Sequence, residues 1–349
     1  MLSFRMRAML NSSMDDAIKD YVPLQQHPTI SIFFIAINSI IGILSISGNT
    51  LVLYVKGKEN RSSPESNRTK IRYFVMSLAL SDILAGLISL PVTILMAILY
   101  RAQTDLMCKV VRYIGIVGPV VTTNNLVVMA LERYACVFYP LKVPSRHTII
   151  QCIIIAWVTG SLLTLLPARA YNVIPVDIDD RSYTMQCRVD PMHKHLFLGF
   201  SICAYVLPCA GLIATSAAIG RLLYRKRNRI GEENQPSPRE HASRFQGSRM
   251  LIAITFAMIL PYITYFTYLN ISLYVKAPIS FTSDCIIRMI MTTACYSKGF
   301  FNVLIYIYYM KNIGKTLKAI VCRKKTGPDQ SLSHGATIAN TEELQGIPR

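Results

Sequence analysis

Residues 76–99 read MSLALSDILAGLISLPVTILMAIL, an apolar run in which Asp82 is the only charged residue. A helix needs about 20 mostly apolar residues to cross the hydrocarbon core of a bilayer, and this run is long enough. A strand of a membrane β-barrel would show a shorter segment of alternating polarity instead. The run therefore predicts a transmembrane helix that satisfies its own backbone hydrogen bonds.

Six other segments of the chain are also long and apolar enough to span a bilayer. Together with the first, they predict spans at residues 29–55, 71–99, 106–137, 148–167, 196–223, 250–273 and 286–309. A shorter segment at 310–322 places Ile313, Leu317 and Ile320 on one face and lysines on others, which is typical of an amphipathic helix on a membrane surface. The predicted fold class is an all-α membrane protein, a seven-transmembrane helix bundle with a short amphipathic eighth helix.

The composition supports a membrane protein and excludes an ordinary soluble or disordered one. The 349 residues are 52% hydrophobic and only 16% charged, whereas about 25% is typical of soluble domains. The net charge of +18, from 37 Lys+Arg against 19 Asp+Glu, would suit a nucleic-acid binder. The distribution of the positive residues along the chain points elsewhere.

The basic residues are concentrated on one side of the predicted spans. With the N-terminus outside, the four cytoplasmic pieces carry 6, 3, 8 and 7 Lys+Arg, and the four outer pieces carry 3, 3, 4 and 2. This excess predicts a plasma-membrane protein with an extracellular N-terminus and a cytoplasmic C-terminus. Attraction to the anionic inner leaflet accounts for the basic charge. The expected partner is therefore the lipid bilayer, and no nucleic acid is expected to bind.

The predicted organisation is an extracellular N-terminus (1–28), the seven-span bundle (29–309), the amphipathic helix (310–322) and a cytoplasmic tail (323–349). Residues 1–28 lack the apolar core of a cleavable signal peptide, so we expect the first span to act as the insertion signal. Asn11 begins an outer Asn-x-Ser sequence and is a predicted glycosylation site. Cys322 is a predicted palmitoylation site, with a plain unmodified cysteine as the alternative.

Short motifs recur through the spans in a particular order. The first span contains Gly48-Asn49-Thr50-Leu51-Val52, and the second contains the run SLALSD at 77–82, followed by Pro91. The third ends in Glu132-Arg133-Tyr134, and its Cys108 lies 25 residues before Arg133. The later spans hold Trp157, Pro167, Pro208, Pro261 and Asn302 through Tyr306. In this order and spacing, the chain resembles the rhodopsin-like (class A) G-protein-coupled receptors from Thr29 to about Cys322.

The resemblance implies roles for several of these residues. It implies a disulfide between Cys108 and Cys187, both on the oxidising outer side, although sequence alone does not prove a pairing. It implies contact with a heterotrimeric G protein at the cytoplasmic ends, through Glu132, Arg133, Tyr134 and Leu141. It also implies an activation motif made of Pro261, Asn302 and Tyr306.

Four positions depart from the family pattern. Ile259 stands two residues before Pro261, where the family usually has Trp, and Val303 replaces the usual Pro of the seventh span. Ser216 stands where a Tyr that supports the active state is common. Lys298 occupies a position that is commonly Asn in the family's sodium pocket. These departures leave open whether basal activity is high or absent.

Lys298 has three interpretations. In the first, its ammonium replaces sodium and pairs with Asp82, because a lone charge at membrane depth is costly; the resemblance implies a polar site formed by Asn49, Asp82, Thr122, Lys298 and Asn302. In the second, Lys298 carries retinal, but the opsin lysine corresponds to Tyr296, on a different face of the helix. In the third, Lys298 extends into a water-filled cavity. The expectation is no cofactor and no metal.

The ligand pocket implied by the resemblance is aromatic and apolar with a cationic rim. Its expected residues are Arg112, Gly115, Ile116, Pro119, Phe200, Tyr262, Phe266, Arg288, Thr292 and Tyr296. Gly115 stands where amine receptors place an Asp, so an aminergic ligand is disfavoured, and peptide, lipid and other small ligands remain open. Arg112 and Arg288 either bind an anionic ligand as bidentate forks or pair with acids of the outer loops, such as Asp105, Asp177 or Asp284.

The sequence therefore predicts a receptor that binds an extracellular ligand and activates G proteins. The alternative is a receptor-fold protein without coupling, acting as a decoy or dimer partner, which the missing switch residues would favour. A transporter is disfavoured, because no inverted repeat is visible and Asp82 and Lys298 are the only clear intramembrane charges. No catalytic constellation is recognisable, so no enzyme is predicted.

Overall fold

The structure is a computed structural model of the chain, and it describes residues 17–18, 23–58, 67–99, 104–139, 144–179, 182–228, 238–275 and 279–323. Its elements, in chain order, are β1 (Ala17–Ile18), α2 (Pro23–Gln26), α3 (Pro28–Lys58), α4 (Asn67–Leu84), η2 (Ala85–Ser89), α5 (Leu90–Leu99), α6 (Asp105–Phe138), α7 (Arg146–Leu163), α8 (Leu165–Ala170), β2 (Tyr171–Asp179), β3 (Ser182–Val189), η3 (Pro191–His193), α9 (Lys194–Ser201), η4 (Ile202–Val206), α10 (Leu207–Asn228), α11 (Pro238–Tyr274), α12 (Phe281–Tyr309) and α13 (Lys311–Arg323).

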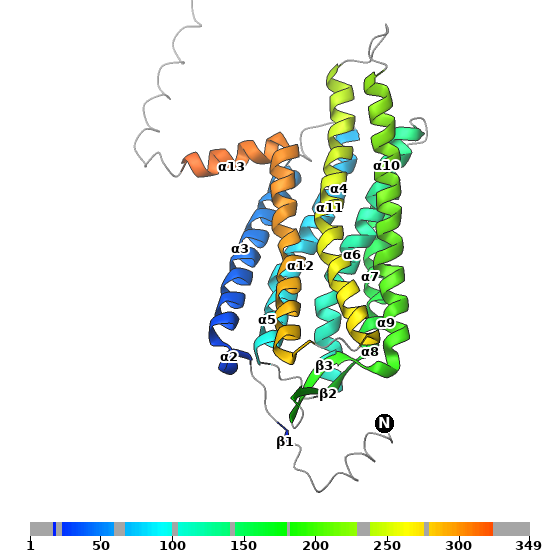
Figure 1. The fold of residues 1–349 in the computed structure, drawn as a ribbon. Helices are drawn as coiled ribbons and strands as arrows, with labels where there is room; N and C mark the ends of the chain where they lie inside the picture. The colour runs from blue at the N-terminus through cyan, green and yellow to red at the C-terminus, as the bar shows by residue number, and fades with distance from the viewer. Residues whose placement is uncertain are drawn as a thin grey trace, which may run out of the picture.

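The long helices lie side by side in a bundle, with a β-hairpin at one end and α13 at the other (Figure 1). We call these the hairpin end and the α13 end. Helix α6 is in contact with α4, α7, α10 and α11, so it runs through the middle of the bundle. The predicted helix bundle is confirmed, and each predicted span corresponds to a helix or to consecutive helical segments.

Six of the described helical stretches are long and apolar enough to cross a membrane, and α12 is a less apolar seventh. The 29 residues of α12 exceed the length of a bilayer span, but the helix carries Lys298 and Asn302 in its interior. Both of these side chains are buried, at 3% and 2% exposure. Because α12 packs between α3 and α11, its polar residues face protein rather than lipid.

The second outer segment, predicted only as a loop, contains a β-hairpin. Strands β2 and β3 pair antiparallel, and the two residues of β1 add to β3 in parallel. The strands are rich in Val, Ile, Tyr and Thr, which favour pleated, half-buried surfaces. The predicted fold class holds, since the structure is mostly helical, but this hairpin was not predicted, because apolar length is a criterion for spans and not for strands.

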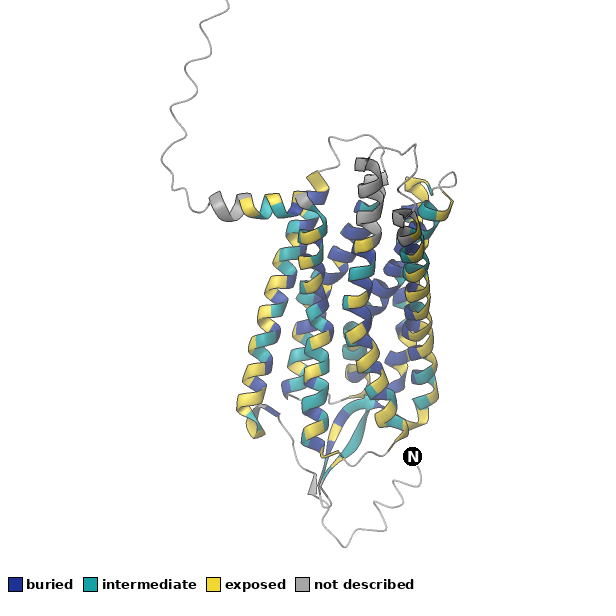
Figure 2. Cartoon of the chain, turned by 45° about the horizontal axis from the view of Figure 1, so that its top comes forward, coloured by how far each residue is buried: buried dark blue, intermediate teal, exposed yellow. Residues whose placement is uncertain are grey.

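Large apolar side chains are exposed on the outward faces of the bundle, and a group of polar and charged side chains is buried inside it. On helices α3 and α7 of the bundle, four large apolar side chains are 56–67% exposed: Phe33, Ile43, Ile154 and Leu162. Figure 2 shows exposed residues along the outward faces of the helices and buried ones along the inward faces. Apolar patches of this extent are unusual on soluble monomers and are typical of a surface that contacts lipid.

Two prolines follow wide helical turns. The π-helical segment η2 comes just before Pro91, and η4 comes just before Pro208. In each, the residue before the proline donates its N–H to the carbonyl five residues earlier, from Leu90 to Ala85 and from Leu207 to Ile202. A proline has no N–H to donate and crowds the preceding turn, so a widened turn accommodates it within a continuous span.

Helix α13 turns away from the end of α12 at a steep angle (Figure 1). Ile313 is completely buried where α13 contacts α3 and α12, whereas Lys315 and Lys318 are exposed. This arrangement matches the predicted amphipathic helix. Nothing is described of the side chain of Cys322, and Asn11, Leu141 and the tail from residue 324 lie outside the described residues.

Candidate functional site

A cavity of about 650 Å³ opens at the hairpin end of the bundle, between the helices and the β2–β3 hairpin. It is lined by nine of the ten residues expected from the family resemblance: Arg112, Gly115, Ile116, Pro119, Tyr262, Phe266, Arg288, Thr292 and Tyr296. A volume of this size is within the range of small-molecule and cofactor sites. The cavity is the candidate ligand site.

The tenth expected residue, Phe200, does not line the cavity. It is 1% exposed and lies behind the cavity wall, with its ring 6.2 Å from Phe266 and 5.8 Å from Tyr205. The prediction for Phe200 is therefore wrong, because the side chain supports the wall instead of forming it. Tyr205, one turn further along, lines the cavity in its place.

The wall of the cavity is more aromatic than expected. Tyr205 stacks on Phe266 with ring centroids 4.0 Å apart, and the ring centroid of Tyr262 lies 5.9 Å from that of Tyr205. Tyr171 and Tyr265 also line the cavity and were not predicted. The recurrence of aromatic residues at helical spacing in α11 is the sequence signal that could have found Tyr265.

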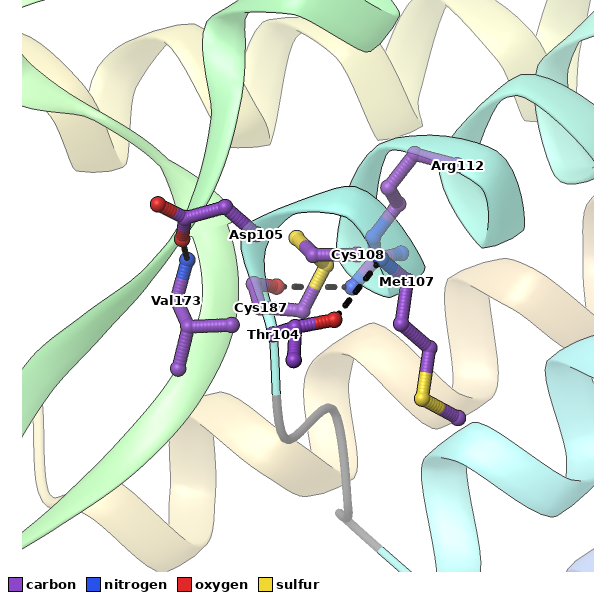
Figure 3. The surroundings of a disulfide bond; sticks show 7 residues. All are labelled: Thr104, Asp105, Met107, Cys108, Arg112, Val173 and Cys187. Carbon is purple, nitrogen blue, oxygen red and sulfur yellow. Dashed lines mark hydrogen bonds between the residues drawn. A yellow bond between two sulfur atoms is a disulfide. The ribbon is translucent and has the colours of Figure 1, made fainter.

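The hairpin is tied to α6 by the disulfide between Cys108 and Cys187, whose Cα atoms are 5.4 Å apart. Figure 3 shows two further links beside it. The carboxylate of Asp105 accepts the backbone N–H of Val173 at 2.8 Å, and Arg112 donates to the carbonyl oxygen of Cys187 at 2.9 Å. The pairing implied by the resemblance is present, and it fixes the hairpin over the cavity.

An ion cluster lies on the rim of the cavity. Asp284 is 3.0 Å from the Nε of Arg288 and 2.8 Å from an Nη of Arg188, and it accepts the hydroxyl of Tyr268 at 2.6 Å. Burial alone would raise the pKa of the Asp284 carboxyl, but the two guanidinium groups outweigh it and hold that pKa below its usual value. Arg288 thus follows the alternative in which it pairs with an outer acid.

Arg112 has no such partner. Its guanidinium lies over the ring of Tyr171 at 4.9 Å and donates one hydrogen bond, to the Cys187 carbonyl. No carboxylate lies within 4.0 Å of it among the residues that the structure describes. The two arginines that the sequence treated alike therefore have different surroundings.

A second polar site lies deeper in the bundle, around Asp82. The Nζ of Lys298 is 3.0 Å from one carboxylate oxygen of Asp82 and donates to the Thr122 hydroxyl at 2.8 Å. Asn302 donates to the other carboxylate oxygen at 2.8 Å. Asp82 is 1% and Lys298 3% exposed. The structure thus brings four of the five predicted residues into one buried network.

Asn49, the fifth predicted residue, bonds elsewhere. Its amide donates to the Gly299 carbonyl of α12 at 3.2 Å and to the Ser45 carbonyl of its own helix at 2.9 Å. It joins α3 to α12 beside the ion pair, and no bond from it to Asp82 is present among the described residues. The expected convergence of Asn49 on the carboxylate is therefore not observed.

At the α13 end, Arg133 forms a two-pronged ion pair with its neighbour Glu132. The Nε and one Nη of the guanidinium each donate to a different carboxylate oxygen, and both residues are at most 5% exposed. Tyr134 is half-buried and stacks on Phe138 with ring centroids 4.4 Å apart. The guanidinium is thereby neutralised within its own helix.

The predicted activation residues are Pro261, Asn302 and Tyr306, and Asn302 belongs to the network around Asp82. Pro261 is inside α11, and its carbonyl accepts the thiol of Cys295 from α12 at 3.5 Å. Tyr306 is completely buried, and its hydroxyl has no partner among the described residues. Val303 packs against Gly48, where an added Cβ would lie 2.6 Å from a Val303 methyl group. Ile259, at the position of the usual Trp, is 6% exposed.

The sequence matches the family described as "7 transmembrane receptor (rhodopsin family)" over residues 48–306. The chain therefore belongs to the rhodopsin family of seven-transmembrane receptors, whose members are receptors and not enzymes. It is a multi-pass membrane protein with several apolar helices.

Its relatives include several receptors named for peptides. Neuropeptide FF receptor 2 of Mus musculus is 24% identical in a match that covers 93% of this chain and 82% of the relative. The cholecystokinin receptor of Xenopus laevis is 28% identical over 55% of this chain, and the RYamide receptor of Tribolium castaneum is 23% identical over 77%. The match spans 43% of the length of the frog receptor and 75% of the beetle one.

Proposed function

We propose that this protein is a signalling receptor that binds a ligand in the hairpin-end cavity and activates a heterotrimeric G protein at the α13 end. The observation that carries the proposal is that one helix, α6, supplies residues to both places. Arg112 lines the cavity, and Arg133 forms the buried pair with Glu132. At a rise of about 1.5 Å per residue, the two arginines are about 30 Å apart along the helix, so coupling between them requires a change in helix packing.

The ion pair between Glu132 and Arg133 represents the silent state in this proposal. Both groups are buried, and the charge of the guanidinium is satisfied locally. A ligand that binds better to a bundle whose α13 end is splayed would shift the population toward that state and expose Arg133. Leu141, which lies outside the described residues, is the further G-protein contact that the family resemblance implies.

A peptide is the proposed class of ligand. The relatives named above are receptors for cholecystokinin, neuropeptide FF and RYamide by name. The cavity supports this assignment, because it combines an aromatic wall with charges of both signs on Arg112, Asp177 and Asp284. A peptide offers apolar side chains and charged groups together, whereas the absence of an acid at Gly115 disfavours an amine.

The proposed location is the plasma membrane, with the hairpin end and N-terminus outside and α13 on the cytoplasmic side. The excess of Lys+Arg in the predicted cytoplasmic pieces supports this orientation, and so does the disulfide, since disulfides form in oxidising compartments. Glycosylation of Asn11 and palmitoylation of Cys322 follow from the same orientation and remain predictions.

We also propose that the Lys298 ammonium takes the place of a sodium ion beside Asp82. The space left between Asp82, Lys298 and their neighbours has a volume of about 10 Å³. This volume is about that needed for a single water molecule. Retinal is not proposed, because the ammonium already contacts Asp82 and Thr122. Tyr296, at the position of the opsin lysine, has no amine to form a Schiff base.

The test is basal nucleotide exchange on a panel of G proteins, with the receptor in lipid nanodiscs. Arg133→Ala should abolish exchange, whereas Lys315→Ala, which removes an exposed lysine of α13, should leave it unchanged. If the wild-type protein shows no basal exchange, it is assayed again with cholecystokinin, neuropeptide FF and RYamide. Exchange that persists in Arg133→Ala would refute the role given to Arg133. Absence of exchange under every condition would favour the uncoupled decoy or dimer partner instead.

A further inference from the structure

Apart from Arg112, the charged side chains that line the cavity fall into two groups. Asp284 binds both Arg188 and Arg288 on the rim, and Asp177 is exposed on the hairpin. Arg112 lies apart from both groups, on α6. With three arginines and two aspartates in the lining, the cavity has a net charge of +1. A cavity of this charge favours a ligand with one negative group.

The Arg112 guanidinium has unused capacity for hydrogen bonds. It carries five N–H donors, and one of them reaches an acceptor among the described residues, the Cys187 carbonyl. Its Nε is buried without a partner. A buried donor without an acceptor is unfavourable, so the protein leaves the hydrogen bonding of this guanidinium incomplete and a ligand acceptor would add to it.

The orientation of Arg112 is fixed without neutralising its charge. The carbonyl of Cys187 and the ring of Tyr171 hold the guanidinium in place. The disulfide joins Cys187 to Cys108 of α6 beside Arg112 (Figure 3). A carbonyl oxygen and an aromatic face are dipolar or quadrupolar partners, and neither carries a full negative charge. The group is therefore positioned in advance, which lowers the entropy lost on binding an anion.

The helix also leaves space next to Arg112. Gly115 lies three residues further along α6, on the same face, and also lines the cavity. A Cβ built on Gly115 would approach only the Thr93 hydroxyl, at 3.7 Å. The aromatic wall of Tyr205, Tyr262 and Phe266 bounds the same cavity.

We propose that Arg112 binds a carboxylate of the ligand, with an aromatic or aliphatic group beside that carboxylate packed against the tyrosine-lined wall. A carboxylate matches the fork of a single guanidinium in both geometry and charge. A phosphate dianion would need a second free cation, and Arg188 and Arg288 are already engaged by Asp284. The inference rests on the proposed function, since it names the chemistry of the ligand of that same cavity.

The experiment compares 3-phenylpropionate with 3-phenylpropionamide, which has a similar shape but no charge. Dissociation constants are measured on the full chain in nanodiscs, by ligand-observed NMR. Wild type should bind the acid more tightly than the amide, and Arg112→Gln should weaken the acid by about 10- to 100-fold while leaving the amide unchanged. Arg112→Lys, which keeps the charge but loses the fork, should retain part of the preference.

The matched control is Arg146→Gln, which removes an exposed guanidinium that lies over the ring of Tyr73 at the start of α7, outside the cavity, and it should keep the preference for the acid. Equal binding of acid and amide by wild type, or an unchanged preference in Arg112→Gln, would overturn the proposal. So would loss of the preference in Arg146→Gln. Binding is measured without a G protein, so a failure of coupling affects the proposed function and leaves this result interpretable. The retained amide binding reports that each variant is folded.

Discussion

Replacing Lys298 by methionine tests the buried ion pair directly. The methionine has a similar length and no charge, so the change removes the ammonium that lies 3.0 Å from Asp82 and 2.8 Å from the Thr122 hydroxyl. Asp82 then keeps one donor among the described residues, the Asn302 amide. Because Asp82 is only 1% exposed, its carboxylate loses a charged partner without gaining contact with bulk solvent.

The expected cost follows from breaking one side of a buried ion pair, which is about 3–5 kcal/mol. Lys298→Met should therefore show a clearly lower thermal stability in nanodiscs. Adding Asp82→Asn should recover most of the loss, since the double variant buries no unpaired charge. Thr122→Val, which removes a neutral acceptor of the ammonium, should cost about 1 kcal/mol and is the matched control.

Sodium supplies the second part of the assay. If the ammonium occupies the place of a cation, Lys298→Met should be stabilised when sodium chloride replaces potassium chloride at equal ionic strength, by RT ln(1 + [Na⁺]/Kd). The wild-type protein should show no such difference. Stability of Lys298→Met within about 1 kcal/mol of wild type, or a sodium effect on wild type, would refute the reasoning.

Two further predictions concern the rim and the helix packing. The pKa of Asp284 is held below its usual value by Arg288 and Arg188, so the stabilisation that this carboxylate contributes is present at neutral pH and is lost as pH falls below the ordinary carboxyl pKa of about 4. Thermal stability measured against pH should show this loss in wild type and not in Asp284→Asn; parallel curves would contradict it. Gly160→Ala should destabilise the bundle by about 1–3 kcal/mol, because the new Cβ would lie 3.0 Å from the Val121 Cα. Gly211→Ala, where no atom lies within 4 Å, is the control, and an equal effect of both would refute the contact.

The spans could be predicted because a helix in lipid depends mainly on apolar length. The same criterion also predicted the span at 286–309, although the buried Lys298 lowers the apolarity of α12. It was silent on the β-hairpin, whose strands satisfy each other's hydrogen bonds and need no apolar run.

The candidate ligand site was predicted from the family resemblance, which implies pocket positions on several helices. This succeeded for Arg112, Gly115 and Pro119, because residues on one helical face share their surroundings. It failed for Phe200, whose helix faces the cavity wall from behind. It also missed Tyr171, which reaches the cavity only because the hairpin folds over the bundle.

The sequence by itself determined the family, the membrane-spanning helices and the identity of the charged groups, because these depend on composition and on spacing along the chain. Only the tertiary structure decided which charges meet. It pairs Lys298 with Asp82 and Arg188 with Asp284, and it leaves Arg112 without a carboxylate among the described residues. The physical reason is that the energy of a charge in a protein depends on its neighbours within a few ångströms, and those neighbours come from other helices and from the hairpin.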